Sequence, residues 1–213
     1  MIQYFTTFLM ANRGNQNQNQ PPPAIAKCHT PPPDYSTDSY CKKECSSYEY
    51  SLNPTPFGRI LEGILPAYTY GETENTLTFR DRTPRAPLHA LVIPKTRIPS
   101  IQQLSANDLG LLHEMKREAL ETIRINSYFH SGTVKDEGNC TGLNMTRGES
   151  VLERGDYILC FHIPPFTSVD HLHLHVLAPK SEMNLIYRHG KYQIGTPWCA
   201  DLEDVIGFLE KGG

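Results

Sequence analysis

The sequence predicts an α+β fold, in which an antiparallel sheet of about five strands has one long helix packed on one face. Two hydrophobic patterns carry this prediction. Several short runs are either continuously apolar or alternate between apolar and polar residues, which is typical of strands. One longer stretch repeats its apolar residues at helical spacing. The 213 residues suffice for one domain of this kind and a tail.

The first 52 residues differ in composition from the rest. Alternating Asn and Gln at 15–20 are followed by triple prolines at 21–23 and 31–33. Such a segment offers little apolar surface to offset its ordering entropy. We therefore expect 1–52 to be a disordered, proline-rich tail and 53–213 to be the folded domain. A second polar stretch, 131–155, is interpreted as a loop insertion in that domain.

The first half of the domain contains a short helix and three strands. Residues 54–65 place apolar side chains on one side and predict the helix. Residues 68–79 alternate on both sides of Glu74-Asn75 and predict a hairpin. Residues 88–93 form an apolar run ended by a proline, as expected of a central strand.

The long helix is predicted over residues 105–125. Ser105 and Asp108 fit a capping box, and Leu104 can pack onto Leu109 as a hydrophobic staple. One face of this helix then carries the apolar residues Leu109, Leu112, Met115, Ala119 and Ile123.

In the second half of the domain, the sequence predicts three strands and a closing helix. The strands are expected at 157–162, 171–177 and 186–194, and the helix at 201–209. Two consecutive prolines interrupt the connection between the first two of these strands.

Three histidines, His171, His173 and His175, alternate with aliphatic residues in the strand predicted at 171–177. A period of two places all three imidazoles on one face of the strand, roughly 6.5–7 Å apart. The residues alone leave three interpretations open: histidines on a solvated sheet face, a zinc site, or nucleophilic and acid–base catalysis.

This histidine run resembles the signature of the histidine triad family of nucleotide hydrolases and transferases. The resemblance extends over about 55–210 and includes the helix and hairpin at 57–94. The segments 162–171 and 185–188 are similar to the type-3 branch of the histidine triad nucleotide-binding proteins, the adenosine 5′-monophosphoramidases. The resemblance implies a histidine triad fold and hydrolysis of purine nucleoside 5′-phosphoramidates to the nucleoside monophosphate and an amine.

The resemblance also implies roles for individual residues. His173 would attack the α-phosphorus and form a nucleotidyl-histidine, which water would release. His175 would contact the phosphate and the leaving group. His171 and His89 would hold the catalytic rings in the right tautomer.

Further positions would bind the substrate. Ser168 would donate to a phosphate oxygen or the leaving group, and the Thr167 backbone would help stabilise charge. Asp81 would accept hydrogen bonds from the ribose hydroxyls, with Arg80 and Arg82 beside it. The positions that would hold the base are Phe57, Ile60, Leu65 and Phe79.

Two departures from the family pattern bear on metal and phosphate binding. Some relatives hold a structural zinc ion, but the corresponding positions here are Thr55, Gly58 and Arg97, so we expect no metal and no cofactor. Where many relatives have an asparagine and a glycine-rich loop, this chain has Cys160 and His162. We interpret His162 as structural.

Composition limits the partners and the location. The net charge of −3 argues against a nucleic-acid binder, and no apolar stretch is long enough to span a membrane. Six cysteines are too few for a disulfide scaffold, which favours a cytoplasmic location and leaves the nucleus open. Members of the family often form homodimers, and the sequence leaves this open. The alternative functions are a dinucleoside polyphosphate hydrolase, an aprataxin-like deadenylase and a non-catalytic nucleotide-binding regulator.

Overall fold

The computed structural model describes residues 53–126 and 147–212. The predicted tail at 1–52 and most of the predicted insertion, 131–146, lie outside these residues. The domain boundaries therefore stay predictions.

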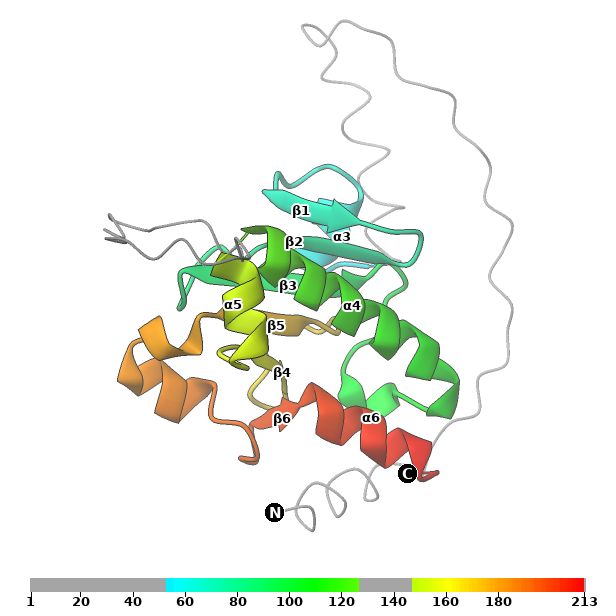
Figure 1. Ribbon diagram of the computed structural model, residues 1–213. Coiled ribbons are helices and arrows are strands. Elements are labelled where there is room, and N and C mark those ends of the chain that lie inside the picture. The colour runs from blue at the N-terminus through cyan, green and yellow to red at the C-terminus, as the bar shows by residue number, and fades with distance from the viewer. Residues whose placement is uncertain (1–52, 127–146, 213) are drawn as a thin grey trace, which may run out of the picture.

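The described residues form one antiparallel sheet with helices on both faces, which confirms the predicted α+β class (Figure 1). The sheet has six strands rather than about five, in the order β1-β2-β3-β5-β4-β6. In chain order, the strands are β1 Thr69–Glu72, β2 Thr76–Arg80, β3 Leu88–Pro94, β4 Ile158–His162, β5 Leu174–Ala178 and β6 Cys199–Asp201.

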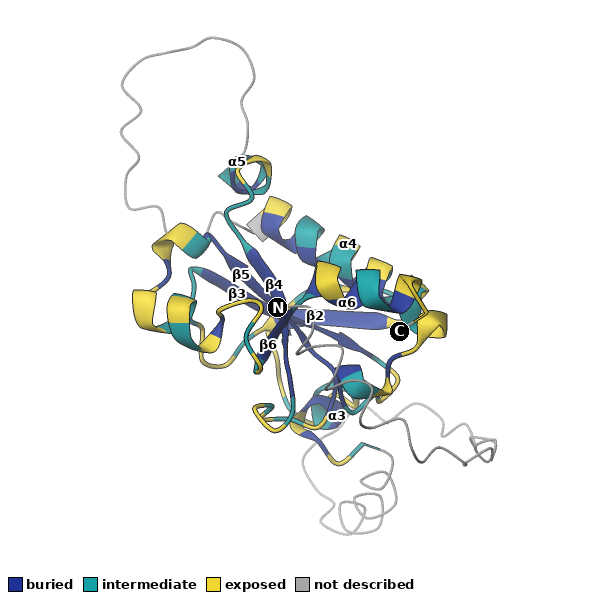
Figure 2. Ribbon diagram, turned by 90° about the horizontal axis from the view of Figure 1, so that it is seen from below, coloured by how far each residue is buried: buried dark blue, intermediate teal, exposed yellow. Residues whose placement is uncertain are grey.

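The long helices cover one face of this sheet. Helix α4, Leu109–Asn126, and helix α6, Leu202–Glu210, lie on the face opposite the short helix α3, Pro56–Leu61 (Figure 2). The apolar core between α4, α6 and the sheet includes buried side chains from β3, β4 and β5. The other face of the sheet is therefore free to carry a different set of side chains.

The predicted start of the long helix is confirmed. The Ser105 backbone N–H donates to the Asp108 carboxylate over 2.8 Å, and the two residues form the capping box. This cap belongs to a short 3-10 turn, Ala106–Asp108, after which α4 begins at Leu109. The apolar face of α4 is buried as predicted at Leu112, Met115, Ala119 and Ile123.

Two secondary-structure predictions are wrong. Residues 186–194, expected to be a strand, contain the π-helical turn Tyr187–Lys191, because the Tyr192 N–H donates to the Tyr187 carbonyl at 2.9 Å. Part of the expected loop insertion, Arg147–Glu153, is helix α5, which packs against α4. The sequence did not indicate α5, because only Gly148 and Val151 of this helix are buried and its other positions are polar or partly exposed, so no apolar face repeats at helical spacing.

The sequence also missed β6, because a strand of three residues leaves no periodicity to detect. β6 pairs with β4, so β4 is not an edge of the sheet. Among the helices of the described residues, none combines the length and the apolar character needed to cross a bilayer.

Candidate active site

The alternating histidines divide the two faces of the sheet as predicted. Leu172, Leu174 and Val176 join the core under α4, while His173 and His175 point to the opposite face. β5 itself begins only at Leu174, and the His173 and His175 ring centroids are 5.0 Å apart. The rings thus lie closer together than the backbone repeat suggested.

Neighbouring strands bring two more histidines to this face. Leu91 of β3 pairs with His175, so His89, two residues earlier, shares its face. Cys160 of β4 also pairs with His175, which places His162 on the same face. The ring centroid of His175 is 5.3 Å from that of His89 and 4.5 Å from that of His162.

The hydrogen bonds of His89 fix the tautomer of His175. The Arg85 backbone N–H donates to His89 Nδ1 at 3.2 Å, so a neutral His89 carries its proton on Nε2. That Nε2–H then donates to His175 Nδ1 over 3.0 Å. His175 therefore carries its own proton on Nε2, which is buried and has no hydrogen-bond partner in the described structure. This arrangement leaves a donor ready for an incoming ligand.

His173 is held in the opposite tautomer. Its Nδ1–H donates to the carbonyl of His171 over 2.7 Å, which leaves the lone pair on Nε2. The backbone of His171 fixes this tautomer, rather than its imidazole. That ring donates from Nε2 to the Pro94 carbonyl at 2.8 Å and accepts from the Asn53 side chain at 3.0 Å. Such a site pairs a nucleophilic nitrogen with a donor from the next histidine.

Burial keeps the whole cluster neutral. Burial lowers the pKa of His173, of His171 and, most strongly, of His175 below the ordinary value for histidine. It lowers the pKa of His89 and of His162 to about 4. Neutral imidazoles are competent nucleophiles, so His173 can react at neutral pH.

Two of the predicted base-binding residues lie beside His173. Phe57 packs edge-on against His173, with ring centroids 5.3 Å apart, and against Phe79 at 5.6 Å. Both aromatic rings are buried. The other two, Ile60 and Leu65, are half-buried. They line a groove of about 470 Å³ between the end of α3 and the β1–β2 hairpin.

The predicted ribose residue is joined to the histidine cluster. Asp81 Oδ2 lies 3.5 Å from His89 Nε2, while Oδ1 accepts from the Thr83 backbone N–H at 2.7 Å. Asp81 thus contacts the same nitrogen that orients His175. Arg80 and Arg82, on either side of it, are exposed.

The loop between β4 and β5 carries the remaining predicted residues. Ser168 is exposed and Thr167 is half-buried. The end of this loop is attached to the chain after β3, because Arg97 pairs with the Asp170 carboxylate over 2.5 Å. The Leu172 N–H also donates to the Ile98 carbonyl over 2.6 Å. These contacts fix the backbone on which His171 and His173 stand.

The positions that could have held a structural zinc ion have other roles. Thr55 caps α3 by accepting from the Gly58 N–H, and Arg97 pairs with Asp170. One nitrogen each of His162, His173 and His175 lies within 4.8 Å of the others, a spacing that could reach a metal ion. The proton on His175 Nε2 opposes this, because a metal ligand needs a free lone pair there.

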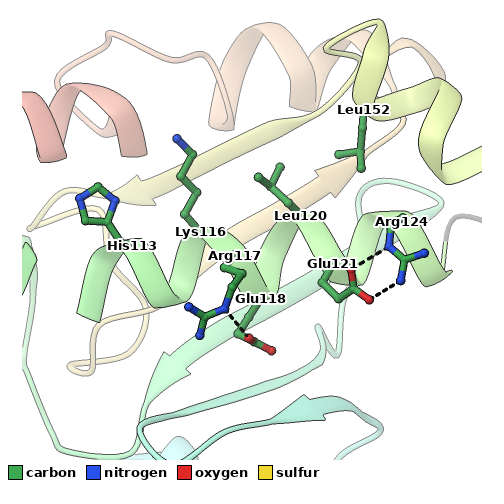
Figure 3. Close-up of a pocket in the computed structure, with 8 residues that line it drawn as sticks. All are labelled: His113, Lys116, Arg117, Glu118, Leu120, Glu121, Arg124 and Leu152. Atoms are coloured by element: carbon green, nitrogen blue, oxygen red, sulfur yellow. Dashed lines mark hydrogen bonds and ion pairs between the residues drawn. The ribbon is translucent and has the colours of Figure 1, made fainter. Parts of the chain in front are cut away.

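A different hollow, of about 530 Å³, lies along the outer side of α4 (Figure 3). Its walls carry paired charges such as Arg124 with Glu121 and Arg117 with Glu118. It lies on the helix side of the sheet, away from the histidines. We assign it no function.

Two residues of the site were missed by sequence reasoning. Asn53 donates to His171, and Tyr192 packs against His89, His162 and His175 with ring centroids 5.3–5.6 Å apart. No motif marks either residue. Tyr192 belongs to the segment expected to be a strand, so its approach to the histidines could not be foreseen.

Buried, mutually oriented histidines that alternate along the chain into one strand, as His171, His173 and His175 do at the start of β5, are the arrangement of a histidine triad protein. The profile of the family described as "Scavenger mRNA decapping enzyme C-term binding" matches residues 55–189, which include every predicted site residue. The chain therefore belongs to this histidine triad family.

Curated relatives cover most of the chain. Adenosine 5′-monophosphoramidase HINT3 of Danio rerio is 32% identical over 81% of this chain and 93% of its own length. The protein of the same name from Mus musculus is 29% identical over 78% of this chain and 86% of its own length. A solved HIT family hydrolase from Legionella pneumophila is 28% identical over 58% of this chain and 90% of its own, with a TM-score of 0.44.

Proposed function

We propose that this protein hydrolyses the P–N bond of adenosine and other purine nucleoside 5′-phosphoramidates. The observation that carries the proposal is the tautomer of His173, whose Nδ1–H is bound to the His171 carbonyl so that Nε2 can attack phosphorus. The names of the relatives from Danio rerio and Mus musculus support the same activity.

The reaction would run in two displacements. His173 Nε2 forms a bond to the α-phosphorus, and the P–N bond of the substrate breaks with its electron pair going to the amine. The departing amine takes a proton from solvent, while the Nε2–H of His175 would donate a hydrogen bond to the leaving nitrogen or to a phosphoryl oxygen. The oxygen of a water molecule then bonds to phosphorus as the bond between phosphorus and His173 Nε2 breaks, its electron pair returns to His173, and the water's proton passes to solvent, which releases the nucleoside monophosphate.

The substrate would lie across α3 and the histidine face. Phe57 and Phe79 would hold the base with Ile60 and Leu65, and Asp81 would bind the ribose diol. Ser168 and the Thr167 backbone would contact the phosphate or the leaving group. Two exposed arginines, Arg80 and Arg82, would supply positive charge nearby.

Turnover of adenosine 5′-phosphoramidate tests this function. The wild type should release AMP, and H173A should lose at least about a thousand-fold in kcat while it still binds AMP. An adenylyl adduct should be trapped on His173. A wild type that binds AMP but releases no amine would leave a non-catalytic nucleotide-binding regulator as the better description.

The same proposal includes the partners and the location. The substrate is a small nucleotide, and the net charge of −3 is unfavourable for nucleic acid. A homodimer with a continuous sheet would form through β1 or β6, because β6 covers β4. The buried, free thiols of Cys160 and Cys199 support a reducing compartment, the cytoplasm or the nucleus.

A further inference from the structure

His162, which the sequence suggested was structural, occupies a central place among the histidines. It is the last residue of β4 and is only 6% exposed. Its ring lies on the opposite side of His175 from His89, because the two residues come from the two strands that flank β5. His175 is therefore enclosed by one imidazole from each neighbouring strand.

The spacing of three of these rings suits a phosphoryl group. One nitrogen each of His162, His173 and His175 lies within 4.8 Å of the other two. A hydrogen bond from nitrogen to a charged phosphoryl oxygen spans about 2.8 Å. Three nitrogens at this spacing can therefore contact a single tetrahedral group placed between them, one at phosphorus and two at its oxygens.

The present partner of His162 holds it only weakly. Its Nε2 lies 3.3 Å from the Lys191 carbonyl, which is long for a hydrogen bond of this type. A neutral imidazole carries its single proton on either nitrogen, so the ring can exchange this partner for a better acceptor. The positive charge of Lys191 also acts on His162 and would favour an anion beside it.

We propose that His162 donates a hydrogen bond to a phosphoryl oxygen of the bound nucleotide and is thus a further phosphate-binding residue of this site. The proposal rests on the proposed function in one respect, that the site binds nucleoside 5′-phosphates. The competing view is that His162 only joins β4 to the Lys191 carbonyl. The two views differ in what the loss of the imidazole does to phosphate recognition.

Binding of AMP and of adenosine separates these views, because the two probes differ only in the phosphate. Calorimetry should compare the wild type with H162F, which keeps an aromatic ring but has no N–H, and with H162N, which keeps a donor. H162F should weaken AMP binding about ten-fold or more and leave adenosine binding unchanged. H162N should lose about three-fold or more for AMP only. A matched control is H189N, at an exposed histidine, which should change neither constant.

The outcomes that overturn the proposal are equally specific. If H162F binds AMP as tightly as the wild type, or loses AMP and adenosine in the same proportion, His162 does not contact the phosphate. If H162F fails to fold, H162L, which also has no donor, decides the question by the same comparison. A wild type that binds AMP without turnover would refute the phosphoramidase function and leave the His162 comparison intact.

Discussion

Replacing His162 with asparagine should remove part of the protein's sensitivity to acid. Burial lowers the pKa of His162 to about 4 in the folded protein, whereas an unfolded chain has a histidine pKa of about 6.5. Between these two values the unfolded state binds more protons than the folded state. The free energy of unfolding therefore falls as the pH falls through this window.

The size of this effect follows from the two pKa values. For one histidine, the free energy of unfolding lost between pH 7 and pH 5 is about 2 kcal/mol, and it approaches about 3 kcal/mol near pH 4. Asparagine does not titrate, so H162N should lose about 2 kcal/mol less than the wild type over the same pH change. The absolute stability of H162N at pH 7 does not enter this difference.

Urea unfolding at pH 7 and pH 5, followed by the fluorescence of Trp198, measures this difference. H189N, at an exposed histidine, is the control and should lose as much stability as the wild type. If H162N and the wild type lose the same free energy between the two pH values, then His162 titrates alike in the folded and unfolded chains. That result would refute the argument that burial keeps this imidazole neutral.

Three further predictions concern other parts of the site. Gly58→Ala should destabilise the fold by about 2 kcal/mol in thermal unfolding, because a Cβ there would lie 2.1 Å from the Asn53 carbonyl oxygen. The control is Gly110→Ala on α4, where a Cβ would meet open space and stability should not fall. Equal destabilisation by the two variants would contradict this reasoning. His89→Phe should lower kcat for adenosine 5′-phosphoramidate about ten-fold to a hundred-fold with little change in KM, because the hydrogen bond that fixes the tautomer of His175 is lost. An unchanged kcat would show that His89 does not orient His175. Asp81→Asn should reduce the preference for AMP over 2′-deoxy-AMP in calorimetry, and an unchanged preference would exclude Asp81 from ribose binding.

Local patterns predicted most of the regular elements, apart from α5, β6 and the turn at 187–191. The capping box at Ser105 and the apolar face of α4 formed as expected, because both depend on residues within one or two helical turns. The strand expected at 186–194 did not form, because the conformation of this segment depends on how it packs against the rest of the domain. The segment contains a π-helical turn instead.

The candidate site was predicted only in part. The alternation of His171, His173 and His175 indicated that these side chains share one face of the sheet, since the direction of successive side chains on a strand is a local property. The sequence did not indicate that His162 and Tyr192 would pack against His175, because this depends on the order of strands and the path of a distant loop.

The sequence by itself determined which residue types could carry out the chemistry and on which side of a strand they would lie. Only the tertiary structure decided their protonation. The proton positions on His173 and His175 follow from a backbone carbonyl and from His89, a residue on a neighbouring strand. Their neutrality follows from burial between the sheet and the aromatic rings of Phe57 and Tyr192. Tautomer and charge depend on contacts between distant parts of the chain, and no local pattern encodes them.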